Sequence, residues 1–409
     1  MWLMLILVPA YIVGCLYLTW QLIWWLKRTD WGAKHNLKWV MAMLIVLDVI
    51  PIIGAFLPES YFQALCQMIG NVWFAFVLTG AIPIVIANIV KYFIKPITRK
   101  KAATVLIITV AFIVCYDLYG FLHAQEISTH YYALELNNNN VKLLKESMKD
   151  PGRYDVQRRG KTATVTRIAV LADMHMGVNT SFNTIRSLSA QVVNMKADYI
   201  IGAGDYFTSS YDGLFNAEIY PPILAKMAEN SKGAYFAYGN HDVTEPLFCG
   251  FAIKHKSKVF RQPEMDKFFE ECKWNMMADK KFVVPESGIQ FYFRKDASKT
   301  GDGKNDRKPL YKLLADADPD KPVVVVQHEP SDFAEYFNSE VELVISGHTH
   351  DGQIWPASWI TRAASQNAHG YKTIGEIKSI VSSGVGYFGP PMRVGTHGEV
   401  VLIDLVQYN

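Results

Sequence analysis

Five short polar segments in the C-terminal two thirds of the sequence carry the side chains most able to do chemistry. In chain order they contain Asp173, His175, Asp205, Asn240, His241, Asp242, His328, His348 and His350. Their ligand atoms are nitrogens and oxygens with no thiol among them, which favours Mn, Fe or Zn over a cysteine-based structural zinc site. We therefore expect these segments to bind divalent metal ions.

The spacing within the segments favours two metal ions over one. In an extended chain residues i and i+2 project to the same side, so Asp173 and His175 can point into one metal site. The same spacing relates His348 and His350. A carboxylate has two oxygens and can bridge two ions, and Asp205 is the candidate for that role. The pattern predicts a pair of divalent cations.

Short strands are the elements that must bring these residues together. An apolar run precedes each polar segment, at residues 168–172, 199–203, 234–238, 323–326 and 341–345. Uninterrupted apolar runs predict strands covered on both faces, and helical spacing lies between some of them, at 182–196 and 221–230. Ligands of α/β sheets gather beyond the carboxyl ends of strands, so the segments can converge. We expect an α/β domain over residues 155–409, with layered sheets flanked by helices.

Taken together, these motifs resemble the calcineurin-like metallophosphoesterase superfamily. The resemblance covers residues 155–409 and rests on Asp173-x-His175, Gly204-Asp205, Gly239-Asn240-His241-Asp242, His328 and Gly347-His348-Thr349-His350. It is closest to membrane-anchored members described as transmembrane proteins with a metallophosphoesterase domain. One departure is Asp351, where related sequences often have Gly, and we expect it to alter the rim of the site more than its metals.

The resemblance implies a role for each site residue. One metal would bind Asp173, His175, Asp205 and His350, and the second would bind Asp205, Asn240, His328 and His348. His241 would contact the phosphate and protonate the leaving oxygen, while Asp242 would orient His241. Two cations lower the pKa of a shared water and offset the charge that develops during in-line displacement. A metal-bridging hydroxide is therefore the expected nucleophile.

Four long apolar runs fill the first third of the chain, at residues 2–26, 37–57, 64–94 and 102–122. Each reaches the roughly 20 residues that a helix needs to span a bilayer. Lys and Arg follow the first and third runs, whereas the connection at residues 58–60 has neither. Because cationic loops stay cytoplasmic, both ends of this four-span membrane domain, residues 1–124, are expected to face outward. We expect an integral protein of the cell membrane whose catalytic domain is extracytoplasmic.

Residues 125–154 differ in composition from both neighbours, and we expect them to form a linker or stalk. They contain four consecutive asparagines, 137–140, and the turn sequence Asp150-Pro151-Gly152. The asparagine run disfavours the alternative of a short helix over 134–148.

Two smaller questions stay open at the level of sequence. Cys249 and Cys272 would either pair in an oxidising compartment or remain free thiols. Asp48, inside the second apolar run, is either functional or a protonated or helix-paired carboxyl without a function.

These observations predict a membrane-anchored binuclear-metal phosphoesterase. Membrane-proximal or lipid-linked phosphate esters are the expected substrates, because tethering raises their local concentration. One alternative is a phosphodiesterase that acts on soluble nucleotides, and another is a non-catalytic membrane sensor with a phosphoesterase-like domain. With 41 Lys and Arg against 38 Asp and Glu, the net charge is only +3, so a nucleic-acid partner is not expected.

Overall fold

The computed structural model describes residues 2–57, 60–137, 140–156, 162–248, 251–252, 259–304 and 306–408. The chain forms two compact units. The first comprises Met1–His123 with Pro246–Lys254 and Gly389–Met392, and the second comprises Ala124–Glu245, His255–Phe388 and Arg393–Asn409.

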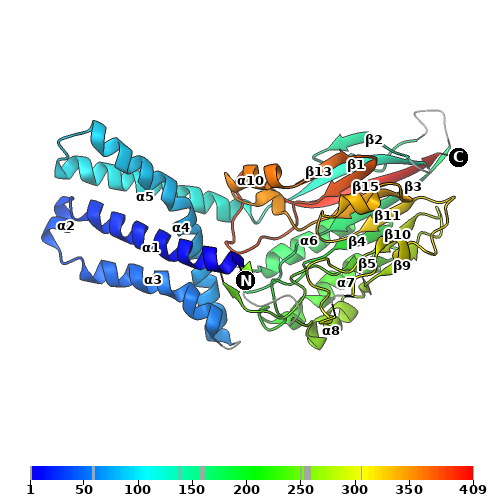
Figure 1. Ribbon diagram of the computed structural model, residues 1–409, viewed down its shortest axis with the longest axis horizontal. Helices are drawn as coiled ribbons and strands as arrows, with labels where there is room; N and C mark the ends of the chain where they lie inside the picture. The colour runs from blue at the N-terminus through cyan, green and yellow to red at the C-terminus, as the bar shows by residue number, and fades with distance from the viewer. Residues whose placement is uncertain are drawn as a thin grey trace. The chain divides into compact units, whose positions relative to one another are not determined.

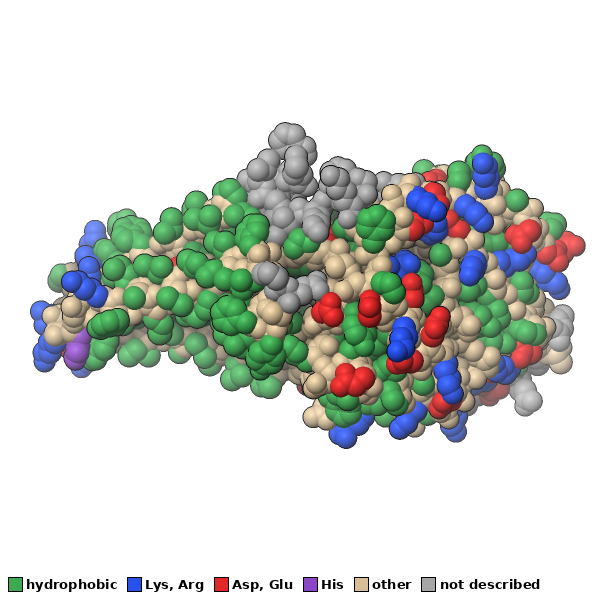
Figure 2. All heavy atoms as spheres, turned by 90° about the horizontal axis from the view of Figure 1, so that it is seen from below, with side chains coloured by type: hydrophobic (Ala, Val, Ile, Leu, Met, Phe, Trp, Pro, Cys, Tyr) green, Lys and Arg blue, Asp and Glu red, His purple; other side chains and the backbone are tan. Residues whose placement is uncertain are grey.

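Long apolar helices build the first unit: α1 Trp2–Leu26, α3 Lys38–Phe56, α4 Tyr61–Phe93 and α5 Arg99–His123, with the short α2 Asp30–Lys34 after α1. All four long helices have the length and hydropathy needed to cross a membrane, as the sequence predicted. Figure 2 shows hydrophobic side chains covering this unit, with Lys and Arg gathered at one end. This distribution suits helices whose sides face lipid and whose cationic loops face water.

Polar side chains inside the helical unit are paired with one another. The Asp48 carboxylate on α3 accepts hydrogen bonds from Thr19 Oγ1 on α1 at 2.9 Å and from Trp73 Nε1 on α4 at 2.8 Å. Asp117 on α5 accepts from Thr79 Oγ1 on α4 at 2.8 Å. These bonds join neighbouring helices, so they favour a structural, helix-pairing role for Asp48.

Two mixed sheets form the centre of the second unit (Figure 1). The larger has the order β2-β1-β15-β3-β4-β5-β8, and the smaller has the order β13-β14-β12-β11-β10-β9. The larger sheet contains β1 Ile127–Asn137, β2 Asn140–Ser147, β3 Ala163–Leu171, β4 Tyr199–Ala203, β5 Ala234–Ala237, β8 Asn275–Met277 and β15 Gly398–Tyr408. The smaller contains β9 Lys280–Val283, β10 Gln290–Phe293, β11 Val323–Val326, β12 Val341–Ser346, β13 Gly370–Ile374 and β14 Ile377–Val381. The remaining strands, β6 Leu247–Phe248 and β7 Phe251–Ala252, pair with each other.

Apolar side chains of the two sheets pack against each other in one core. Ile168 and Val170 on β3 share this core with Val324 and Val326 on β11. Helices α6 Phe182–Asn194, α7 Pro221–Glu229 and α8 Pro263–Glu271 pack on the outer face of the larger sheet. Helix α9 Leu310–Leu313 and the 3-10 turn η4 Phe333–Tyr336 pack on the smaller sheet. The predicted fold of layered sheets flanked by helices is confirmed.

The prediction of a linker or stalk over residues 125–154 is wrong for most of that segment. Strand β1 pairs in parallel with β15, from Ile127 opposite Gly398 to Glu135 opposite Val406, and β2 pairs with β1 in antiparallel fashion. The β-prone run of residues 127–136 buries one face in each core, and the asparagine run joins the two strands. The alternative of a helix over 134–148 is wrong for the same reason.

The segment between Asp242 and His328 contributes to the core. Phe268 and Phe269 on α8 pack against the larger sheet. Cys272 is a buried, free thiol, and Cys249 lies outside the described residues. Remaining short helices are η2 Ala217–Ile219, η5 His350–Gly352 and α10 Ala357–Ala364.

Candidate metal centre

The polar segments emerge at the carboxyl ends of parallel strands. Strands β3, β4 and β5 are parallel neighbours in the larger sheet, and β11 and β12 are parallel neighbours in the smaller. The segments that follow these strands carry Asp173 with His175, Asp205, Asn240 with His241, His328, and His348 with His350. Each sheet thus contributes part of one site.

Three of the predicted ligands form a first group. The ligand atoms of Asp173, His175 and His350 all lie within 4.8 Å of one another. His175 Nε2 is 3.0 Å from His350 Nε2, and His350 Nε2 is 3.6 Å from Asp173 Oδ1. All three side chains are buried.

A second group consists of Asp205, His328 and His348, with Asn240 beside it. His328 Nε2 is 3.0 Å from Asp205 Oδ2, and His348 Nδ1 is 3.1 Å from Asn240 Oδ1. Asp205 Oδ2 also lies 3.6 Å from Nε2 of His175 in the first group. Asp205 therefore stands between the two groups, where a bridging carboxylate would be needed. The structure brings all seven predicted ligands together.

The backbone that carries these ligands is in an uncommon conformation. Asp173, His175, Asp205, His348 and His350 all have φ between 43° and 76°. Residues other than glycine seldom adopt the left-handed region, and such strain concentrates at functional sites. The paired ligands meet through tight turns, so the extended-chain geometry assumed from the i, i+2 spacing is wrong.

Close packing behind Asp205 explains the glycine before Asn240. A Cβ atom at Gly239 would collide with the Asp205 carboxylate. Gly204 has φ of 94°, which a residue with a side chain would seldom adopt. Both glycines allow the turns that hold Asp205 beside the ligands of the neighbouring strands.

Burial sets the charge state of the centre. Burial raises the pKa of Asp173 to about 7 and lowers the pKa of His175 to about 4. Burial alone would also raise the pKa of Asp205, but the charges of His328 and His241 hold it well below its ordinary value. The neutral imidazole of His175 is the donor form that divalent cations bind. Burial alone would also lower the pKa of His328, but the Asp205 carboxylate holds it well above its ordinary value.

Two further features test whether these donors fit metal ions. His328 Nδ1 lies 2.8 Å from the Ala203 carbonyl oxygen, which turns Nε2 toward Asp205, as in histidine ligands held by an outer hydrogen bond. His175 Nδ1 is buried and has no hydrogen-bond partner among the described residues. A buried imidazole nitrogen without a partner, together with buried carboxylates among imidazoles, is a donor set that fits divalent cations. The exposed side chain of His348 leaves the centre accessible from solvent.

His241 lies at the edge of the centre. Its backbone N–H donates to Asp205 Oδ1 at 2.7 Å, and its ring centroid is 5.3 Å from that of His175 and 5.1 Å from that of Phe388. The Nδ1 atom is 3.7 Å from Glu245 Oε1. The imidazole is thus close to the ligands without belonging to either ligand group.

Asp242 does not contact the imidazole as the resemblance implied. Its carboxylate accepts backbone hydrogen bonds from Gly239 at 2.8 Å, Asp205 at 3.0 Å, Tyr206 at 2.8 Å and Phe207 at 3.1 Å. These bonds fix the turn that presents Asp205, so we reassign Asp242 from orienting His241 to organising the backbone of the site.

The carboxylate nearest the His241 imidazole is Glu245, which the sequence analysis missed. Glu245 is buried and accepts a hydrogen bond from the buried Lys299. The i, i+4 spacing from His241 was a visible signal for Glu245. No local pattern pointed to Lys299, which lies 54 residues away in sequence.

Asp351 is buried in η5, directly after His350. It has φ of 51° and accepts hydrogen bonds from Arg362 Nε at 2.8 Å and Nη2 at 2.5 Å. Arg362 belongs to α10, so this ion pair ties α10 to the turn that carries His350.

One protein family model matches the part of the chain that carries the site. Residues 166–352 match the family model of the calcineurin-like phosphoesterases. This part of the chain is therefore similar to calcineurin-like phosphoesterase domains, and it carries candidate metal-binding residues.

Alignments with individual relatives are longer than the match to the family model. An uncharacterized metallophosphoesterase from Campylobacter jejuni is 26% identical over 247 residues, covering 58% of this chain and 59% of the relative. A transmembrane protein with metallophosphoesterase domain from Danio rerio is 25% identical over 266 residues, covering 62% and 56%. The matches thus span under two thirds of these relatives' length. Among solved structures, a 5'-nucleotidase precursor from Thermus thermophilus aligns with 59% of this chain and 55% of its own at 12% identity, with a TM-score of 0.32.

Proposed function

We propose that this chain is a membrane-anchored phosphoesterase that uses two divalent metal ions. The observation that carries the proposal is the meeting of seven oxygen and nitrogen donors from five strand ends, with Asp205 between the two groups. Asp173, His175, Asp205 and His350 would hold one ion, and Asp205, Asn240, His328 and His348 the other. Bound cations would supply Lewis acidity, activating water and offsetting charge on the phosphoryl oxygens.

The chain's own residues have separate tasks in this proposal. Asp205 holds both halves of the centre together, and the backbone bonds of Asp242 keep Asp205 in place. His241 would donate a proton to the leaving oxygen from Nε2, while Glu245 lies on the Nδ1 side of the ring. Phe388 packs beside the His241 ring.

The test is a measurement of metal content and hydrolysis on the full chain in detergent. An aryl phosphodiester and an aryl phosphomonoester serve as substrates, each with and without a chelator. We expect metal-dependent hydrolysis of at least one of them. Bound metal without hydrolysis of either ester would favour the non-catalytic sensor, and a chain without bound metal would contradict the proposal.

We further propose that the substrates lie at the membrane. Helix α10 follows η5, which contains His350, and exposed apolar side chains lie on the helix, at Trp359 and Ile360, and just before it, at Trp355. Trp359 and Ile360 are 63% and 70% exposed. Apolar and tryptophan side chains of this kind bind at the interface of a bilayer. Because the same chain carries four helices able to cross a membrane, the bilayer is the partner that these side chains fit.

The orientation of the domain is also part of the proposal. Cationic residues Lys27, Arg28 and Lys34 follow α1, and Arg99, Lys100 and Lys101 begin α5. Under the positive-inside rule these loops are cytoplasmic, which puts the end of α5 and the metallophosphoesterase domain on the opposite side.

A further inference from the structure

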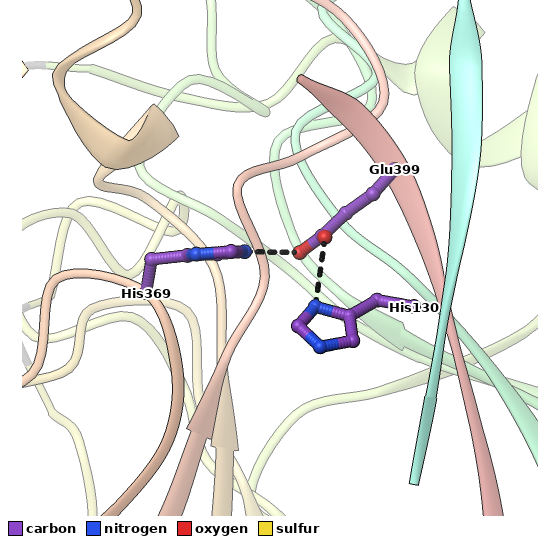
Figure 3. Close-up of side chains that lie close together, drawn as sticks. All are labelled: His130, His369 and Glu399. Atoms are coloured by element: carbon purple, nitrogen blue, oxygen red, sulfur yellow. Dashed lines mark hydrogen bonds and ion pairs between the residues drawn. The ribbon is translucent and has the colours of Figure 1, made fainter. Parts of the chain in front are cut away.

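A separate cluster of potential metal ligands lies outside the centre described above. It consists of His130 on β1, Glu399 on β15 and His369, which directly precedes β13; Figure 3 shows both imidazoles directed at the same carboxylate. Their ligand atoms all lie within 4.8 Å of one another. We propose that these three side chains bind an additional divalent transition metal ion, with zinc the best match to the donor set.

The distances in this cluster agree with the edges of a zinc coordination sphere. His369 Nε2 is 3.0 Å from Glu399 Oε1, and His130 Nδ1 is 3.4 Å from Glu399 Oε2. With zinc–ligand bonds of about 2.0–2.1 Å in tetrahedral geometry, neighbouring ligand atoms stand about 3.3 Å apart. Two histidines and one glutamate also form a ligand set that zinc enzymes use.

An outer hydrogen bond prepares His130 to act as a ligand. Its Nε2 lies 2.8 Å from Oε1 of Glu146 on β2, so the Nε2–H can donate to that carboxylate. With the ring proton on Nε2, Nδ1 carries the lone pair on the side of Glu399, where the Tyr132 hydroxyl also lies 3.3 Å from Nδ1. Metal-bound histidines commonly donate their second ring N–H to a carboxylate in this way.

The carboxylate of Glu399 is buried at 1% exposure and requires cationic or hydrogen-bonding partners. His369 Nε2 lies at hydrogen-bonding distance from Glu399 Oε1, 3.0 Å away. The Ser383 backbone N–H also donates to Glu399 Oε1 at 2.9 Å. A buried carboxylate between two imidazoles is an oxygen and nitrogen donor set of the kind that zinc binds.

The site would brace the loops of the candidate catalytic centre. The Glu399 backbone N–H donates to the Gly384 carbonyl at 2.9 Å, and Gly384 packs so closely on Asp173 that a Cβ there would lie 2.5 Å from the Asp173 Cβ. Thr349 Oγ1, between two predicted ligands, donates to the carbonyl of Ala368 at 2.5 Å. A metal on His369 and Glu399 would therefore stabilise both loops without contacting substrate.

The first test counts bound zinc. The full chain in detergent is stripped with a chelator, reloaded with Zn²⁺, desalted and analysed by plasma mass spectrometry. We expect His369→Ala and Glu399→Gln each to bind one zinc fewer per chain than wild type, whereas the exposed control His35→Ala loses none. The zinc content of Asp205→Asn measures binding at the candidate catalytic centre separately, because this variant keeps His130, His369 and Glu399. Wild-type zinc content in folded His369→Ala would overturn the additional site, whatever Asp205→Asn does.

The second test gives a positive signal and does not rely on loss of binding. Loaded with Co²⁺, the variant His369→Cys should show a thiolate-to-cobalt charge-transfer absorption that is absent from wild type and from His35→Cys. Far-ultraviolet circular dichroism establishes that each variant is folded. Absence of this absorption in the folded His369→Cys protein would overturn direct contact between residue 369 and a metal.

Discussion

At the scale of single residues, the candidate centre combines buried histidines with buried carboxylates that have few other cationic partners. Burial lowers the pKa of His175 to about 4 and raises the pKa of Asp173 to about 7. Imidazole is therefore present in its metal-binding form, and a cation would stabilise the ionised form of Asp173.

His241 is predicted to act on the leaving group and not to bind metal. Because a general acid matters most when the leaving group is a weak acid, His241→Ala should lower kcat for an alkyl phosphate ester by about 10²–10⁴-fold. Hydrolysis of a nitrophenyl ester should fall much less, and the metal content should stay at the wild-type level. Equal losses for both esters would contradict the proton-donor role; His35→Ala is the matched control.

Individual ligands could be predicted from sequence because each sits in a short motif directly after a strand. The roles of Asp242 and Glu245 could not be predicted in the same way. Which carboxylate faces His241 depends on the turn around Gly239, where four backbone N–H groups engage Asp242 and leave Glu245 nearest the ring. That geometry arises from the tertiary structure, so the order of these residues in the sequence does not predict it.

At the scale of elements, β1 and β2 show how a segment with linker-like composition can belong to the core. The segment contains an asparagine run, but the residues before it are β-prone, and Tyr131, Tyr132 and Leu134 are buried. Pairing with β15 involves residues about 270 positions away, so no local pattern reveals it.

The position of β1 predicts how truncated chains behave. A chain of residues 124–409 keeps β1 beside β15, whereas a chain of residues 155–409 exposes the edge of β15 and part of both apolar cores. Exposed apolar strand edges promote aggregation, so the shorter chain should be largely insoluble and the longer one recovered in solution. Size-exclusion chromatography of the soluble fractions measures this, and equal recovery of both chains would be inconsistent with β1 as a core strand.

Helix α10 is predicted to bind the bilayer beside the centre. Burying one large apolar side chain contributes about 1.5–3 kcal/mol, so Trp359→Ser with Ile360→Ser should reduce hydrolysis of a long-chain lipid phosphate ester in vesicles by about tenfold or more. Hydrolysis of a short-chain, water-soluble analogue should not change. Tyr311→Ser on α9, 71% exposed, is the matched control. A similar fall for both substrates would point to damage within the centre and contradict lipid binding.

At the scale of the whole molecule, the cationic loops between the apolar helices predict on which side of the membrane the C-terminal domain lies. A reporter that functions only in the cytoplasm should be inactive when fused after Tyr408 and active when fused after Lys34, in the loop between α1 and α3. Reporter activity after Tyr408, with none after Lys34, would show the opposite orientation and contradict the prediction. The four spans themselves could be predicted from sequence because about 20 consecutive apolar residues have few other stable environments.

The most direct test of the central claim is the metal content and activity of Asp205→Asn in the full chain. Changes to residues that merely support a metal ligand cost about 10–100-fold in affinity or activity, so loss of a ligand shared by two ions should cost more than about 100-fold. We predict that Asp205→Asn binds two metal ions fewer than wild type and loses hydrolysis of an aryl phosphodiester, whereas the exposed control Asp212→Asn keeps both. Retention of both ions together with wild-type turnover in Asp205→Asn would contradict the binuclear centre.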